Sequence, residues 1–289
     1  MSKLHDLAVR RGYAIGWRVA GALPAPVVAR VIAQASARVL RHNGVHVRTL
    51  RTNLSAATGR PASDDLVRAA LGSYLRNLYE VLALPSWSPR RVVTSVTTDG
   101  ELAFRATHTA TGAVVALPHS GNWDLAGAWA CLTRLPVTTV AEALPNEEFE
   151  SFLRFRQGLG MEVLSHRDPA ALIKLIGAVR RGRLVCLLAD RDLGGRGLRV
   201  HWRGHPIRMP AGPAWVARRS GAALLPAVSQ YTPGGMKIIF GEPIEQQAGR
   251  DGLVAMTQQV ADFFAERIAE RPQDWHVMQP FFDRMEIAR

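Results

Sequence analysis

The chain has 289 residues, 47% of them hydrophobic and 25 of them glycine, so it can bury a sizeable core and is not an intrinsically disordered protein. Its formal net charge of +12 favours anionic partners such as lipid headgroups, phosphates or nucleic acid. No stretch reaches the roughly 18 uninterrupted apolar residues of a membrane-spanning helix, and no apolar core of a secretory signal follows the early charges. We therefore expect a protein that stays in the cytoplasm or lies on a membrane without crossing it.

Residues 1–110 are predicted to form a helical portion. Between positions 27 and 41 the hydrophobic residues recur at helical spacing, with arginines on most of the opposite face. A further helix is predicted for DDLVRAALGSYLRNLYEVLAL, with Ser63 as its N-cap. An apolar face beside arginines suits a helix that lies in a membrane interface, and it equally suits an ordinary helix that packs on a protein core. The apolar residues of the first helix are Val27, Val28, Val31, Ile32, Ala35 and Val39.

From residue 113 the pattern changes to short apolar runs that are typical of buried strands. Helical stretches separate these runs, two of them with predicted N-caps at Asn146 and Asp168. This alternation predicts an α/β fold with a largely parallel, twisted sheet flanked by helices. We expect a single domain, 1–289, with a helical portion over 1–110 and an α/β portion over 111–289. The predicted strands are AVVAL, PVTTVAE, MEVLS, RLVCLLA, AALLPAV and MKIIFG, and a closing helix covers 251–271.

The positive charge is concentrated in two segments. Residues 1–60 carry ten Lys or Arg against one acid, and residues 178–219 carry ten Arg against two acids. Only three of the 36 basic residues are lysines, and arginine is the residue that recognises phosphate with paired hydrogen bonds. Two explanations stay open, because an arginine-rich composition also arises from a GC-rich genome.

Reactive side chains gather where two predicted strands end. AVVAL runs into His119, and RLVCLLA runs into Asp190 and Asp192; chemistry collects at the carboxyl ends of parallel strands. The spacing of His119 and Asp124 predicts that the Asp124 carboxylate can hold one imidazole nitrogen and leave the other free to take a proton. The same spacing also arises by chance or as a plain helix cap. Ser120 does not predict a hydrolase, because HSGNW is not the G-x-S-x-G turn of a nucleophilic serine.

Here the sequence resembles a known family. HSGNWD matches the H-x4-D motif of the lipid A lauroyl/myristoyl acyltransferases, part of the wider lysophospholipid acyltransferase group. The resemblance runs nearly end to end. VRTLRTNL is similar to that family's helical N-terminal portion, and FLRFRQGLGMEVL to the segment with its F-x-x-x-R motif, here Phe152 to Arg156. LLADRDLGGRGLRVHWRGHPIRMPAGPAWVARRSGAALLPA is similar to its acidic strand and following loop, while RMPAGPA and PQDWHVMQPFF resemble the actinobacterial phosphatidylinositol mannoside acyltransferases.

The resemblance implies an acyltransferase-like fold and an acyl-CoA-dependent O-acyltransferase. His119 would take a proton from a hydroxyl of the acceptor lipid, held by carboxylates that include Asp124. The oxygen would then attack the acyl-CoA thioester without a covalent acyl-enzyme. The phosphatidylinositol mannoside subgroup has a glutamate as the acidic partner of the histidine, whereas this chain has Asp190 or Asp192, and which of the two takes that place is left open.

The resemblance also suggests substrate-binding residues. Arg156 is the family's candidate for binding a phosphate of the acceptor or of CoA, and Arg191 and Arg208 belong to a basic segment that would attract an anionic substrate. Each of these arginines could instead be an ordinary surface residue. No cofactor or metal is implied, so Asp190-Arg191-Asp192 is not interpreted as the metal site of a glycosyltransferase. Trp275 and His276 are expected to pack the last helix.

Three functions follow from these features. The first is transfer of a long-chain acyl group, palmitoyl being expected, to a mannose hydroxyl of a phosphatidylinositol mannoside. The enzyme would be a peripheral protein on the cytoplasmic face of the inner membrane, without a nucleic-acid partner. The second is acyl transfer to another acceptor, such as a lipid A precursor or a lysophospholipid. The third is a basic membrane- or nucleic-acid-binding protein without catalysis. A long apolar groove for one acyl chain would separate the two enzymes from the third.

Overall fold

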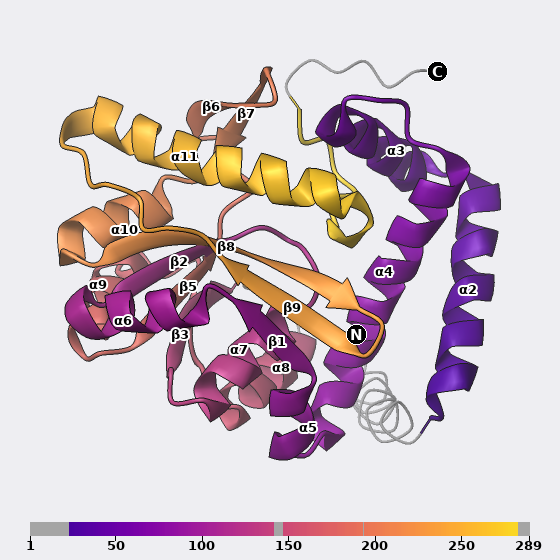
Figure 1. Cartoon of the computed structure of the whole chain (residues 1–289), viewed down its shortest axis with the longest axis horizontal. Helices are drawn as coiled ribbons and strands as arrows, with labels where there is room; N and C mark the ends of the chain where they lie inside the picture. The colour runs from indigo at the N-terminus through magenta and orange to yellow at the C-terminus, as the bar shows by residue number, and fades with distance from the viewer. Residues whose placement is uncertain (1–22, 142–146, 193, 283–289) are drawn as a thin grey trace.

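A seven-stranded sheet runs through the described part of the molecule (Figure 1). The computed structural model describes residues 23–141, 147–192 and 194–282. The strand order is β1-β9-β8-β2-β5-β3-β4, and all neighbours are parallel except β8 and β9. The predicted α/β fold with a largely parallel sheet is therefore confirmed. The strands are β1 (Val96–Asp99), β2 (Ala113–Leu117), β3 (Val137–Ala141), β4 (Glu162–Ser165), β5 (Leu184–Leu188), β8 (Ala223–Thr232) and β9 (Gly235–Phe240).

Helices cover both faces of this sheet, so the central strands are buried on both sides. In β2, Val114 and Ala116 contribute to the core on one face, and Ala113 and Val115 to the core on the other. This is why AVVAL is a continuous apolar run and not an alternating one. The first face is covered by α9 (Ala171–Arg180), α10 (Gly212–Ser220) and α11 (Gly249–Glu270). The second is covered by α5 (Pro89–Thr94), α6 (Glu101–Thr111), α7 (Trp123–Leu132) and α8 (Glu147–Gly158).

In the described part of the N-terminal portion, from residue 23 on, three helices stand beside the sheet, on the right of Figure 1. They are α2 (Ala25–His42), α3 (Val45–Thr58) and α4 (Asp64–Ala83), and the short 3₁₀ turn η1 (Leu84–Ser86) follows them. The Ser63 side chain accepts a hydrogen bond from the Leu66 N–H, which confirms the predicted cap of α4. A small apolar core of their own joins α3 to α4, through residues such as Leu50, Leu54 and Leu71.

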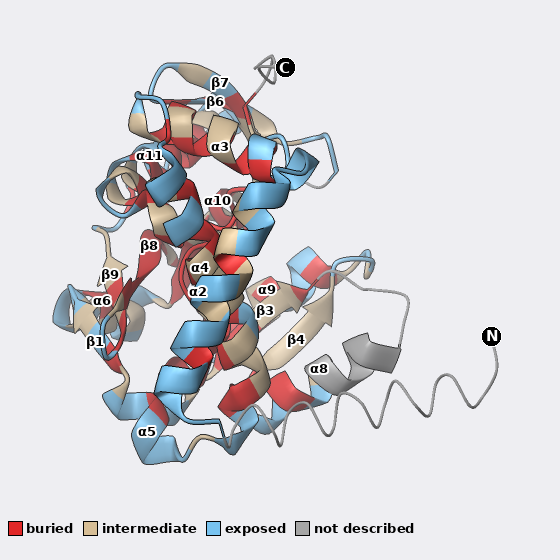
Figure 2. Ribbon diagram, turned by 90° about the vertical axis from the view of Figure 1, so that its right-hand side faces the viewer, coloured by how far each residue is buried: buried red, intermediate tan, exposed pale blue. Residues whose placement is uncertain are grey.

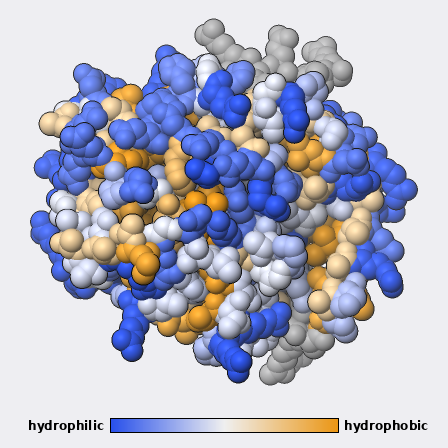
Figure 3. All heavy atoms as spheres, in the orientation of Figure 1, coloured by the Kyte–Doolittle hydropathy of each residue, from blue (hydrophilic) through white to orange (hydrophobic). Residues whose placement is uncertain are grey.

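One part of the apolar face of α2 is buried against the protein, and another part is exposed. Val28 is buried, whereas Val27 and Val31 are 44% and 57% exposed. Figure 2 shows α2 lying across the outside of the molecule with most of its length exposed. In the orientation of Figure 1, hydrophobic and hydrophilic residues are interspersed at the right of the molecule, where α2 and α4 lie (Figure 3). Within the described residues, no helix has both the length and the hydrophobicity that crossing a membrane requires.

Three elements differ from the sequence prediction. The edge strand β1 lies inside the portion predicted to be helical, because four residues are too few to give a periodic signal. A hairpin of β6 (Leu198–Trp202) and β7 (His205–Met209) was not predicted, since basic residues interrupt its apolar positions. Asp168 is not the N-cap of α9, which begins at Ala171; its carboxylate instead accepts from the Ala170 N–H at 2.9 Å. The predicted cap at Asn146 lies outside the described residues.

The segment that follows α11 returns to the centre of the molecule. After the turn η2 (Pro272–Asp274), the Trp275 ring stacks on Trp202 of the hairpin, with centroids 5.4 Å apart. The buried Asn53 amide of α3 donates to the carbonyls of Val277 and Gln279, at 2.9 and 2.8 Å. Helix α3 and the β6–β7 hairpin thus fix this segment against the ends of β2 and β5.

Candidate active site

His119 follows β2 and Asp190 follows β5, and these strands are neighbours in the sheet. The Nδ1 atom of His119 lies 2.6 Å from Oδ1 of Asp190, and the His119 main-chain N–H donates to Oδ2 at 3.0 Å. The indole N–H of Trp275 also donates to Oδ2, at 3.0 Å. Because a carboxylate only accepts hydrogen bonds, Nδ1 carries the proton of the neutral imidazole and Nε2 is the acceptor.

Asp190 is fully buried, and its charge is stabilised by these partners. Burial alone would raise the pKa of the carboxyl. The charge of His119 and the hydrogen bonds from His119 and Trp275 outweigh burial, so the pKa of Asp190 lies below its ordinary value. The carboxylate therefore stays ionised at neutral pH and holds the His119 ring in one tautomer. An imidazole held in this way can take a proton from a hydroxyl group.

Asp124 pairs with Arg156 and not with His119. The Arg156 Nε atom donates to Oδ1 of Asp124 at 2.6 Å, and a terminal nitrogen donates to Oδ2 at 3.2 Å. The two side chains are only 2% and 9% exposed. The contact predicted between Asp124 and the imidazole is therefore wrong. Helix α7 begins at Trp123, so Asp124 lies in its first turn and pairs with α8, while Asp190 supports the ring from the neighbouring strand.

The Ser120 hydroxyl is not placed to act as a nucleophile. Its hydroxyl donates to the Ser229 carbonyl at 2.8 Å, and the residue is 2% exposed. The next residue, Gly121, has φ +60°, and a Cβ atom there would lie 2.8 Å from the same carbonyl oxygen. The turn between β2 and α7 therefore requires glycine at this position. Close packing of this turn against β8 fixes the backbone of the turn, and with it the position of His119.

Asn122 ties the same turn to helix α4. Its side-chain oxygen accepts from the Leu125 N–H at 2.9 Å and caps α7, while its amide donates to the buried Glu80 at 3.0 Å. Glu80 in turn accepts from Arg76 Nε at 2.7 Å. Because Arg76 and Glu80 belong to α4, the N-terminal helices position the H-x4-D turn directly.

His276 lies beside His119 and is held by a second hydrogen-bond chain. Its main-chain N–H donates to the His119 carbonyl at 2.7 Å. The Ser73 hydroxyl donates to Asp274 at 2.9 Å and so accepts from His276 Nε2 at 3.0 Å, which leaves Nδ1 as a bare acceptor. No partner for Nδ1 is present among the described residues. Burial lowers the pKa of His276 to about 3, with a further lowering by the charge of His119 and a smaller opposing effect of Asp190.

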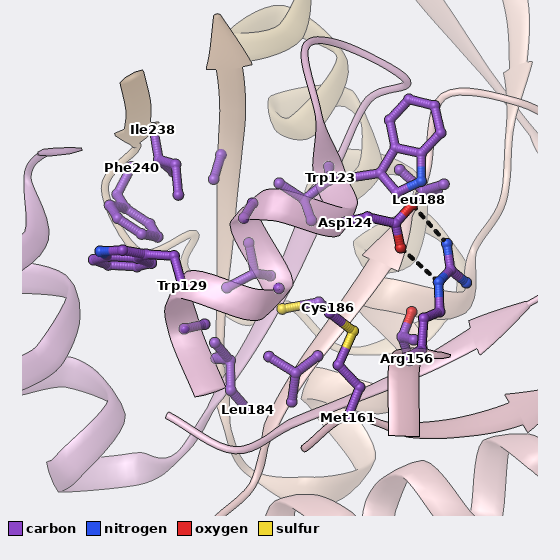
Figure 4. A pocket seen from close by; sticks show the side chains of 18 of the residues that line it. Trp123, Asp124, Trp129, Arg156, Met161, Leu184, Cys186, Leu188, Ile238 and Phe240 are labelled. Carbon is purple, nitrogen blue, oxygen red and sulfur yellow. Dashed lines mark hydrogen bonds and ion pairs between the residues drawn. The ribbon is translucent and has the colours of Figure 1, made fainter. Parts of the chain in front are cut away.

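His119 lines one cavity, and two further cavities adjoin that one. The largest, of about 730 Å³, is a cleft whose walls include His119, His276 and Leu78 of α4. A narrow apolar cavity of about 70 Å³ adjoins it, between α7 and the sheet. Figure 4 shows this cavity with the Asp124–Arg156 pair at one end and Trp129, Ile238 and Phe240 at the other. The two share the lining residues Trp123, Asp124, Val140, Arg156 and Leu188.

A third cavity, of about 180 Å³, adjoins the cleft and is lined by Arg191 and Arg208. Arg191 donates to the side chain of Gln279, and Arg208 donates to the Gly197 carbonyl at 3.3 Å. Asp192 borders both this cavity and the cleft, but its carboxylate accepts from the main-chain N–H groups of Gly194 and Gly197. Of the two acids left open by the sequence, Asp190 contacts His119 and Asp192 holds the loop.

Several residues of this site were not predicted from the sequence. Trp275 and His276 were expected only to pack the last helix, yet one bonds to Asp190 and the other lies in the cleft wall beside His119. Ser73 and Glu80 appeared as ordinary positions of a predicted helix. The available signal was PQDWHVMQPFF, which places two aromatic polar rings beside an acid.

Comparisons with known proteins cover almost the whole chain. The family model described as bacterial lipid A biosynthesis acyltransferase matches residues 5–284. A protein named phosphatidylinositol mannoside acyltransferase from Mycolicibacterium smegmatis is 39% identical over 278 residues, which cover 93% of this chain and 90% of the relative. A protein of the same name from Mycobacterium tuberculosis is 38% identical over 284 residues, covering 93% and 86%.

Proposed function

Since the chain belongs to the bacterial lipid A biosynthesis acyltransferase family and is an acyltransferase, we propose that it transfers an acyl group from acyl-CoA to a mannose hydroxyl of a phosphatidylinositol mannoside, with His119 as general base. The observation that carries this proposal is the hydrogen bond of 2.6 Å between His119 Nδ1 and Asp190. It leaves Nε2 as the proton acceptor in a residue that lines the cleft.

The chemical step needs few groups. Nε2 of His119 takes the proton of the acceptor hydroxyl while that oxygen bonds to the thioester carbon. The carbon–sulfur bond then breaks, and the departing thiolate takes the proton from the imidazolium. A positioned base contributes roughly 10²–10⁴-fold to such a reaction. Ser120 takes no part, because its buried hydroxyl is already bonded to the Ser229 carbonyl.

Each of the three cavities suits a different part of the acyl donor or of the lipid acceptor. The cleft of about 730 Å³ has room for a sugar headgroup beside His119. The apolar cavity suits part of one acyl chain, here proposed to be palmitoyl, and an apolar site of this kind is what separates an acyltransferase from a protein that only binds membranes. The cavity lined by Arg191 and Arg208 suits a phosphate of the acceptor or of CoA.

The sequence suggested that Arg156 binds a phosphate of the substrate. In this proposal Arg156 acts instead as part of its pair with Asp124. Its guanidinium forms two hydrogen bonds with Asp124, and both residues border the cleft and the apolar cavity. The pair lies where the cleft and the apolar cavity adjoin. No separate cofactor or metal enters the proposed step.

We further propose that the protein works as a peripheral enzyme on the cytoplasmic face of the cell membrane. The exposed Val27 and Val31 of α2 and the exposed Leu78 of α4, which lines the cleft, support this orientation. Arg30, Arg38 and Arg41 of α2 suit anionic headgroups. Binding to anionic vesicles should weaken as salt is added. The binding that remains at high salt should come from the apolar residues. Equal binding to neutral and anionic vesicles at low salt would contradict the electrostatic part.

The acceptor is tested by incubating the purified protein with radiolabelled palmitoyl-CoA and a panel of lipids. Mannosylated phosphatidylinositol should be acylated and unmannosylated phosphatidylinositol should not, because a site built on buried polar groups rejects a substrate that leaves them unpaired. A preference for lysophosphatidic acid or a lipid A precursor would keep the acyltransferase reaction and overturn the acceptor. Transfer to none of these lipids would overturn the proposed reaction.

A further inference from the structure

Helix α4 presents to the cleft one buried amide whose oxygen has no donor. Asn77 is 3% exposed and lines the cleft that holds His119. Its Oδ1 atom is buried, and no hydrogen-bond partner for it is present among the described residues. A buried carbonyl oxygen without a donor destabilises a protein, so nearly all such groups in native proteins are paired. In the wall of a cleft, the donor is expected from the molecule that fills the cleft.

The position of Asn77 along α4 places it next to the H-x4-D turn. Residues three and four apart lie on one face of a helix. Four residues before Asn77, the Ser73 hydroxyl contacts His276 Nε2 at 3.0 Å. Three residues after it, Glu80 accepts from the Asn122 amide at 3.0 Å. Asn77 therefore lies between two contacts of α4, one with the segment after α11 and one with the turn itself.

Two further acceptors line the same cleft. Nδ1 of His276 is buried without a partner among the described residues, and Nε2 of His119 accepts because its Nδ1 proton is held by Asp190. A ligand that matches these acceptors must offer donors at more than one position. The hydroxyl groups of a sugar ring meet this need. A lysophospholipid with a single free hydroxyl does not, and a phosphate group offers oxygen acceptors instead.

We propose that Asn77 is a specificity-determining residue for the acceptor: its side-chain oxygen accepts a hydrogen bond from a mannose hydroxyl other than the one that reacts. The inference rests on the proposed function, because the ring that supplies this hydroxyl is the mannose of the acceptor. Contacts at two hydroxyl groups fix how the ring faces His119. A lipid with one free hydroxyl satisfies His119 and leaves the amide unpaired, which the site penalises.

The test combines one variant with acceptors that each lack one hydroxyl. Asn77→Leu keeps the approximate size of the side chain and removes the amide. The KM for mannosylated phosphatidylinositol should rise about 2–12-fold, the range of one neutral hydrogen bond, while the KM for palmitoyl-CoA should stay as in the wild type. A set of monodeoxy-mannose acceptors is then compared in both proteins. One of them should lower kcat/KM by a similar factor in the wild type and cause no further loss in Asn77→Leu.

A matched control is the same substitution at a buried asparagine whose amide is paired. Asn53 is 1% exposed and donates to two main-chain carbonyls. Asn53→Leu should lower the midpoint of thermal unfolding, whereas Asn77→Leu should keep or raise it, because an unpaired amide is removed. Should Asn77→Leu not fold, Asn77→Ala, which adds no bulk, takes its place in every comparison.

Two results would overturn the inference. A midpoint lowered as far as in Asn53→Leu would show that Asn77 is paired within the protein. Equal losses for every deoxy acceptor in the wild type and in the Asn77 variant would show that no mannose hydroxyl bonds to this residue.

The proposed function can fail separately, because acceptor binding is also measured without an acyl donor. Calorimetry with a short-chain phosphatidylinositol mannoside and its deoxy analogues reports on acceptor recognition alone. Wild-type protein that binds these lipids through Asn77 but acylates none of them would overturn the reaction and leave the inference intact. Wild-type protein that acylates mannosylated phosphatidylinositol with the same deoxy profile as Asn77→Leu would overturn the inference alone.

Discussion

Two buried carboxylates flank the H-x4-D turn, and they differ in what they hold. Asp190, at the end of β5, bonds to the His119 ring, the His119 main chain and the Trp275 indole. Asp124, in the first turn of α7, is matched by the guanidinium of Arg156. The first carboxylate orients a group that can exchange a proton. The second neutralises a fixed cation, which joins α7 to α8 where the cleft and the apolar cavity adjoin.

The largest effect expected from this comparison is on catalysis, at Asp190. Asp190→Asn should lower the turnover number by about 10²–10⁴-fold, because an amide can present its N–H group to Nδ1 and so favour the wrong imidazole tautomer. Asp192→Asn is the matched control, since it removes a carboxylate two residues away whose partners among the described residues are loop N–H groups. Steady-state kinetics should separate the two. Equal losses in both variants would mean that Asp190 has no special relation to His119.

The next largest effect is on stability, at the second carboxylate. Arg156→Met should lower the free energy of unfolding by about 3–5 kcal/mol, because Asp124 would be left buried without its partner. The double variant Asp124→Asn with Arg156→Met should recover most of that loss in denaturant titrations. A double variant no more stable than Arg156→Met would contradict the view that the pair is mainly structural.

An effect that is smaller at any one pH near neutrality is the acid dependence of stability, at His276. The ordinary pKa of 6.5 falls to about 3 in the folded protein, so between these values the unfolded chain binds a proton that the folded chain does not. Stability should therefore decrease as the pH falls through this window, by about 1.4 kcal/mol per pH unit from this one group. His276→Asn should remove that share of the slope in unfolding measured at several pH values. An unchanged slope would show that His276 is not buried as a neutral ring.

The smallest effect is expected at Ser120. Ser120→Ala removes one buried hydrogen bond to the Ser229 carbonyl and should cost about 1–3 kcal/mol of stability, with the turnover number changed less than about tenfold. Mass spectrometry of the wild-type protein during turnover should find no acyl group on this serine. An acyl adduct on Ser120 would replace the direct transfer with a two-step reaction.

The sequence predicts the strands of the sheet other than β1, but it does not predict which strands are neighbours. AVVAL and RLVCLLA are recognisable because both faces of β2 and β5 are buried. Their adjacency depends on the order of all seven strands, which no local pattern contains. That adjacency is what brings Asp190 to His119. The H-x4-D spacing pointed to Asp124 because it describes only positions along the chain, and the direction of Asp124 is decided by where α7 begins.

Long-range contacts explain why the sequence did not indicate the other residues of the site. Trp275 reaches Asp190 because its ring stacks on Trp202 of a hairpin that the sequence did not predict. Ser73 acquires a role only when the segment after α11 packs against α4. The family motif pointed to His119, which lines the cleft, whereas the hydrogen bonds that orient it come from elements 71 and more residues away.

The central claim, that His119 paired with Asp190 is the base of acyl transfer, is tested most directly by one measurement. Wild type and His119→Ala are compared for the rate of radiolabelled acyl transfer from palmitoyl-CoA to mannosylated phosphatidylinositol, with folding of both checked by thermal unfolding. The account predicts a loss of about 10²–10⁴-fold in a folded variant. Near wild-type transfer by folded His119→Ala would contradict it.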